Sequence, residues 1–105
     1  MLKENKIGQI ISLKLSSGDE VVGKIEGQTA EGITLAKPVI LAASREGIAM
    51  VPFMMTGNPD GEYLFKINNI MCLVDTNDQV SDAYIQNTTG IAPVRTSGLI
   101  HASRT

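Results

Sequence analysis

The sequence predicts an all-β fold of about five short strands, a small barrel or a strongly bent sheet, with a short or absent N-terminal helix and a polar C-terminal tail. Apolar residues alternate along several short runs, which is typical of half-buried strands. Clusters of glycine, proline, asparagine and aspartate separate these runs and favour tight turns. The 105 residues, 43% of them hydrophobic, suffice for one compact domain with a modest core.

The first two strands are predicted between Gln9 and Ile25, joined by a turn at residues 16–19. Ile11 and Leu13 share one face of the first strand, and polar residues occupy the other. Gly23 lies inside the second strand, where glycine weakens a strand unless the sheet bends or another backbone comes close. We therefore expect a sharply curved sheet at this point.

A loop from Gly27 to Gly32 leads to a third strand at residues 33–43. Pro38 cannot donate a ladder hydrogen bond, so this strand must bend or lie at an edge there. Two further strands are predicted from the sequence, and only Asn68–Asn69 separates them; they span residues 63–67 and 70–74. The segment 44–62, with a strand-like run at residues 48–55, predicts an added hairpin or a lengthened fourth strand.

The chain changes character after residue 75, so we expect a barrel domain at residues 1–75 and an extension at residues 76–105. Thr76, Asn77 or Asp78 can cap a short helix in which Val80 and Tyr84 share one face. Residues 90–105 show no sustained period. They predict either a flexible tail or an arm that packs on a neighbouring subunit.

Composition argues against several classes of function. Nine basic and eleven acidic residues give a net charge of −2, which offers no long-range attraction to duplex DNA or to anionic lipid. His101 is the only histidine and has no cysteine or acidic residue near it in sequence, so no metal site, cofactor or enzyme is predicted. Cys72, the single cysteine, lies in an apolar run and is interpreted as a small core residue.

The sequence contains no run that approaches the roughly 20 apolar residues of a membrane span. Its first residues also lack an apolar region of signal-peptide length. We therefore expect a cytoplasmic protein without a membrane partner. Aromatic residues make up only 4% of the chain, so the core has few large anchors, and a small domain of this kind often gains stability by self-association.

Two stretches of the chain resemble the two motifs of the Sm-like (LSm) family. The first comprises a strand, the Ser17–Gly18–Asp19 turn, and a second strand with Gly23 and Ile25; the second is the run FKINNIMCLV, residues 65–74. The resemblance extends from about residue 10 to residue 74 and includes small divergent members of phage origin, similar to those of cyanophages. It implies an SH3-like barrel, a homo-oligomeric ring of about five to seven subunits, and a place in the host cytoplasm.

The resemblance also implies a site for single-stranded, uridine-rich RNA. Lys66 stands at the position of the motif cation, where an ammonium group can contact phosphate, and Asn68 and Asn69 follow, with amides that can read a base edge. Gln28 and Thr29 occupy the RNA-contacting loop of the first motif. Asn68–Asn69 can equally be only a turn, because asparagine tolerates turn conformations well.

This chain departs from the family pattern at both motifs. Ile67 replaces the glycine of the second motif, and the asparagine expected in the loop after Gln28 is missing. The apolar run after the turn is the predicted oligomer interface, since it can pair with the fourth strand of a neighbour; it comprises Ile70, Met71, Cys72, Leu73 and Val74. Two functions remain open: a ring that binds single-stranded RNA, and a structural scaffold that binds protein partners and no nucleic acid.

Overall fold

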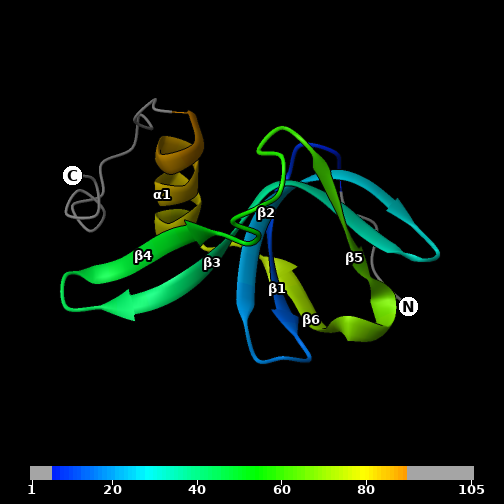
Figure 1. The fold of residues 1–105 in the computed structure, drawn as a ribbon, viewed down its shortest axis with the longest axis horizontal. Coiled ribbons are helices and arrows are strands. Elements are labelled where there is room, and N and C mark those ends of the chain that lie inside the picture. The colour runs from blue at the N-terminus through cyan, green and yellow to red at the C-terminus, as the bar shows by residue number, and fades with distance from the viewer. Residues whose placement is uncertain (1–5, 90–105) are drawn as a thin grey trace.

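The computed structural model describes residues 6–89, which form one antiparallel sheet of six strands and one α-helix (Figure 1). In chain order the elements are β1 (Ile10–Leu15), β2 (Glu20–Thr29), β3 (Gly32–Ser44), β4 (Gly47–Pro52), β5 (Glu62–Lys66), the 3-10 turn η1 (Ile67–Asn69), β6 (Ile70–Asp75) and α1 (Asp78–Thr89). The all-β prediction is therefore confirmed in outline. The predicted tail at residues 90–105 lies outside the described residues.

The strands pair in the order β4-β3-β2-β1-β6, and β5 pairs with the first half of β3. Residues 32–36 of β3 face β5, whereas residues 39–44 face β4. The predicted five strands are thus six, because the segment 44–62 supplies a full hairpin with β3 that projects from the rest of the sheet (Figure 1). No pairing joins β5 to β6 within residues 6–89, so the bent sheet stays open between them.

The exchange of partners takes place at a kink in β3. Lys37 has a positive φ of 48°, an uncommon conformation for a residue with a side chain, and Pro38 follows it. Between the two residue pairs that flank the kink, β2 has one residue, Gly23, and β3 has two, Lys37 and Pro38. β3 therefore carries one extra residue, a β-bulge. A Cβ on Gly23 would lie 2.9 Å from Leu35 Cδ1. The bend expected from Gly23 and Pro38 is confirmed, and both residues act at the same point.

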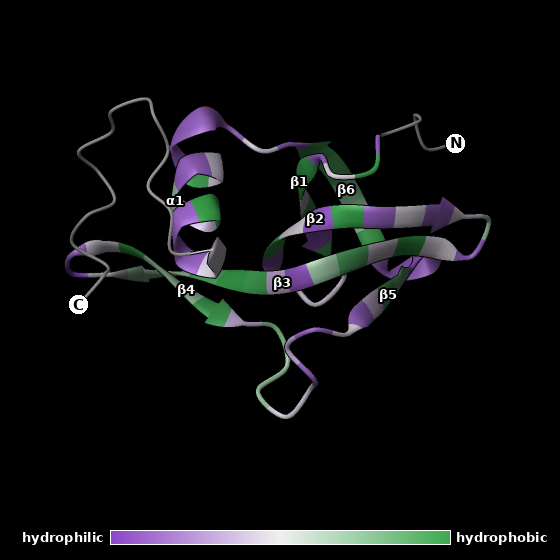
Figure 2. Ribbon diagram, turned by 90° about the horizontal axis from the view of Figure 1, so that it is seen from above, coloured by the Kyte–Doolittle hydropathy of each residue, from purple (hydrophilic) through white to green (hydrophobic). Residues whose placement is uncertain are grey.

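The kink creates two apolar clusters, one on each face of the sheet. The larger fills the inside of the bend and comprises Ile11, Leu13, Leu15, Val21, Ile25, Ile33, Leu35 and Phe65. The extra residue shifts the alternation of β3, so Val39 points to the opposite face from Leu35. There Val39 and Val22 pack under Tyr84 of α1. Figure 2 shows α1 beside β3 on this face of the sheet. The helix therefore covers sheet surface that the kink has turned outward.

The predicted helix is confirmed, and Asn77 is the residue that caps it. The backbone N–H of Val80 donates to Asn77 Oδ1 at 2.9 Å, which satisfies one of the unpaired groups of the first turn. Val80 and Tyr84 face the sheet, as their spacing predicts. No helix within residues 6–89 is long and apolar enough to cross a membrane.

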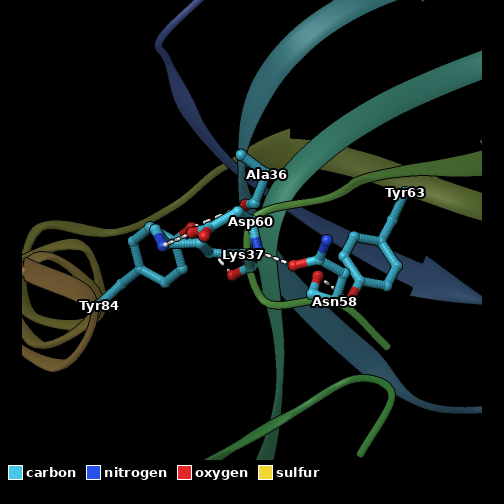
Figure 3. Close-up of polar contacts among 6 residues, drawn as sticks. All are labelled: Ala36, Lys37, Asn58, Asp60, Tyr63 and Tyr84. Carbon is cyan, nitrogen blue, oxygen red and sulfur yellow. Dashed lines mark hydrogen bonds and ion pairs between the residues drawn. The ribbon is translucent and has the colours of Figure 1, made fainter. Parts of the chain in front are cut away.

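Tyr84 fastens the helix to the kink. Its hydroxyl donates to the carbonyl oxygens of Ala36, at 2.9 Å, and Lys37, at 3.0 Å (Figure 3). The side chain is 2% exposed, and burial raises the pKa of Tyr84 from 10.0 to about 12. A neutral phenol thus stabilises carbonyl groups at the point where β3 changes partner.

We expect Tyr84→Phe to lower the free energy of unfolding by about 1–3 kcal/mol, because two carbonyl groups lose their donor. In the wild type this stabilisation is complete below pH 10 and falls between pH 10 and about 12, since the unfolded chain releases the Tyr84 proton first. The decline is at most about 1.4 kcal/mol per pH unit. Urea unfolding of both proteins across this range measures the difference, which should narrow as pH rises.

The matched control is Tyr63→Phe, which removes a hydroxyl that donates to the Asn58 carbonyl at 2.8 Å in an exposed loop. It should cost less stability than Tyr84→Phe. A stability difference between wild type and Tyr84→Phe that stayed constant from pH 8 to pH 12 would contradict the role assigned to Tyr84.

Candidate nucleic-acid interface

Two turns that lie far apart in the sequence meet at one end of the sheet. One joins β2 to β3 and comprises residues 29–32; the other is η1, which joins β5 to β6. The backbone N–H of Ile67 donates to the carbonyl oxygen of Glu31 at 2.8 Å, and Gly32 is paired with Lys66. The structure therefore brings together the two stretches that the sequence analysis assigned to RNA. We call these residues the paired turns.

Gly32 allows the paired turns to approach each other. A Cβ at this position would overlap the carbonyl oxygen of Phe65 and lie 2.9 Å from Lys66 Cα. Real Cβ atoms do not approach backbone atoms so closely, so glycine is required here for steric reasons rather than for an unusual φ. In the sequence, Gly32 marks only the end of a predicted loop.

The residues predicted in the first loop lie mostly within a strand. β2 continues to Thr29, so the loop expected from Gly27 to Gly32 shrinks to Ala30 and Glu31. Gln28 is half-buried and pairs with Ile33, and the hydroxyl of Thr29 accepts the backbone N–H of Glu31 at 3.2 Å. The pairing of β2 with β3 continues past Gly27, where the sequence predicted the start of a loop. Gly27 is tolerated within the strand because it lies next to a register shift in β2.

Lys66, Asn68 and Asn69 are all exposed at the second turn. Lys66 ends β5 and forms no ion pair with any of the described residues. The asparagine pair forms a single 3-10 turn, and the Asn69 carbonyl accepts the Ser16 backbone N–H at 2.9 Å. Asn68–Asn69 is thus a turn whose backbone is anchored to the β1–β2 hairpin. Both amide side chains remain available to solvent.

A groove of about 400 Å³ begins beside this second turn and runs along β5. Lys66 and Asn69 line it together with Phe53, Tyr63 and Phe65. The rings of Phe53 and Phe65 have their centroids 4.9 Å apart and their planes inclined at 57°. Phe53 lies in no motif from which the sequence predicts a site. The one feature of the sequence that could have indicated Phe53 is that phenylalanine is rare: the chain has only two, and their rings contact each other here.

β5 and β6 each pair with one strand only among the described residues, so both present a free edge on either side of η1. Met71 is 69% exposed, Val74 56% and Leu64 45%. Ile70 and Leu73 are half-buried and pack against the core. The predicted interface run therefore points partly inward and partly outward.

Cys72 is exposed on β6, so its interpretation as a core residue was wrong. β6 does not alternate strictly between the two faces of the sheet, because Met71 is an extra residue relative to β1. The bulge at Met71 places Cys72 opposite Lys14, on the outer side of the sheet. An apolar run in an edge strand thus does not identify which of its members are buried.

The electrostatics of the paired turns are balanced rather than basic. Lys66 contributes one positive charge and Glu31, exposed on the facing turn, one negative charge. Within residues 6–89 no group of three or more histidine, cysteine or acidic side chains is arranged to hold a metal ion. Comparison of the chain with protein-family models found no match, and comparison with curated proteins found none either.

Gly32→Ala should separate the paired turns and lower the free energy of unfolding by about 1–3 kcal/mol, because the new methyl group cannot share space with the Phe65 carbonyl. Gly27→Ala is the matched control, since nothing lies within 4 Å of the Cβ it would add. Thermal unfolding of the two variants measures the contrast. Equal effects of the two substitutions would show that the turns do not pack as described.

Proposed function

We propose that the protein is a non-catalytic Sm-like barrel that assembles into a homo-oligomeric ring and binds single-stranded RNA at the paired turns. The observation that carries this proposal is the position of η1: it bears Asn68, follows Lys66 directly, and lies between the free edges of β5 and β6. A contact between these two edges in neighbouring copies would repeat the same polar turn around a ring.

Ring formation follows from the chemistry of the edges. Unpaired N–H and C=O groups of a strand seek partners, and β6 of one copy can add to β5 of the next. The contact joins two different surfaces, so it is head-to-tail and closes into a ring if its rotation permits. Such pairing would bury Met71, Val74 and Leu64, which the single chain leaves exposed.

RNA binding is supported by the residue types at the paired turns and the adjacent groove. The Lys66 ammonium can contact a phosphate, and the Asn68 amide offers both a donor and an acceptor to a base edge. Phe53 and Tyr63 line the groove, and aromatic faces stack on unpaired bases. A ring would present these groups several times, so weak single contacts would reinforce one another.

A scaffold that binds protein partners and no nucleic acid is the second candidate. The net charge of −2 and the acidic Glu31 opposite Lys66 favour it, because both oppose the approach of phosphate. The Thr29 hydroxyl also accepts a hydrogen bond within its own turn, which occupies one of its acceptor positions at the RNA site. We therefore expect weak binding to short uridine-rich strands and none to duplex DNA.

The assembly proposal predicts a mass of several subunits in light scattering at micromolar concentration. Leu64→Lys combined with Met71→Lys should yield monomers, because edge pairing would then crowd two ammonium groups into an apolar contact. Ile7→Lys is the matched control: Ile7 is 71% exposed and lies before β1, so the assembly should persist. A monomeric wild-type protein would refute the ring.

The RNA proposal predicts that Lys66→Ala weakens binding of a labelled uridine-rich oligonucleotide and reduces its salt dependence, because one phosphate contact is lost. Asn68→Ala should instead reduce the preference for uridine with little change in salt slope. Fluorescence anisotropy at two salt concentrations measures both. Lys24→Ala, which removes an exposed lysine from β2, is the control and should change neither quantity.

Failure of the wild-type protein to bind the oligonucleotide at low salt would overturn the RNA proposal. The ring could still exist in that case, since light scattering tests it separately. A ring without RNA binding would favour the scaffold function.

A further inference from the structure

A second hollow, distinct from the paired turns, lies at the kink of β3. It encloses about 380 Å³ between the kink, the end of β4, the loop before β5 and the last turn of α1. Pro38, Val39, Pro52 and Phe53 form its apolar wall. We call this hollow the kink groove. Phe53, Met54 and Tyr63 also line the groove along β5, whereas the part formed by β3, the end of β4 and α1 belongs to the kink groove alone and is used by neither proposed function.

Two methionines at the outer wall of the kink groove are unusually exposed. Met54 is 47% exposed and Met55 82%, although both are large apolar side chains next to an apolar hollow. Such adjacency is typical of a surface that another segment covers, and methionine adapts readily to an irregular partner. Asn87 and Thr88 of α1 form a further part of the wall, so the helix ends beside the groove.

We propose that residues 91–95 of the same chain, the sequence Ile-Ala-Pro-Val-Arg, dock in the kink groove. Helix α1 ends at Thr89, directly after two residues that line the hollow, and each further residue extends the chain by up to about 3.3 Å. Ile91 is three residues beyond Thr88 in the sequence, so the chain is long enough to bring it back to the groove. This inference stands apart from the proposed function.

The composition of the segment is complementary to the groove. Ile91, Pro93 and Val94 supply apolar surface for the wall and for the exposed methionines. Arg95 supplies a cation to a groove end where α1 terminates without a basic residue in its last turn, so the negative end of the helix dipole is uncompensated there.

Charge over the whole chain favours the same occupant. Residues 90–105 carry Arg95 and Arg104 and no acidic residue, while the rest of the chain has a net charge of −4. Lys37 lines the groove and pairs with Asp60 at 3.6 Å; the Asp60 side chain is 87% exposed, so its carboxylate can accept a second cation (Figure 3).

The full-length protein labelled with ¹³C at its methionine methyl groups tests the proposal by NMR. Ile91→Asp combined with Val94→Asp should shift the Met54 and Met55 signals and leave those of Met50 and Met71 in place, because only the first two lie at the groove. Leu99→Asp combined with Ile100→Asp is the matched control and should leave all four signals unchanged. Unshifted Met54 and Met55 signals in the first variant would overturn the proposal.

A reciprocal measurement does not depend on variants of the segment. With isoleucine methyl labels, Met55→Glu should shift the Ile91 signal and not that of Ile7, which lies before β1. Met55 is exposed, so its replacement should leave the fold intact. An Ile91 signal that was insensitive to Met55→Glu would show that the segment does not occupy the groove.

Discussion

The exchange of partners in β3 at Lys37–Pro38 is the constraint on which the rest of the structure depends. This strand of thirteen residues pairs with β5 through its first half and with β4 through its second half. Pro38 has no N–H to donate, and one extra residue opposite Gly23 re-aims the backbone. The carbonyls of Ala36 and Lys37 receive the Tyr84 hydroxyl. A buried polar group thus stabilises the bend that the sheet requires.

The position of the candidate site follows from this kink. Because the first half of β3 is paired with β5, the chain leaves β5 beside the β2–β3 turn, and Ile67 bonds to Glu31 there. The second half of β3 and β4 form a projecting hairpin, and among the described residues β5 and β6 each pair with one strand only. The kink also turns Val39 outward, where α1 covers it and ends beside the kink groove.

Electrostatics and assembly act in opposite directions at the paired turns. A single chain offers one cation, Lys66, within a molecule of net charge −2, which is a weak attraction for phosphate. Repetition of Lys66 and Asn68 around a ring would strengthen that attraction through multivalency, provided the edges pair. The same edges would serve a protein scaffold equally well, so only the chemistry of the turn distinguishes the two functions.

The sequence alone determined the features that short-range chemistry controls. The alternating apolar runs predicted the positions of most strands, and Gly23 and Pro38 predicted the bend. Asn77 and Tyr84 indicated the start of the helix and its buried face. Only the tertiary structure decided which strands pair with each half of β3, the exposure of Cys72 and the meeting of Phe53 with Phe65. These depend on bulges and on contacts between distant segments, for which a local pattern carries no signal.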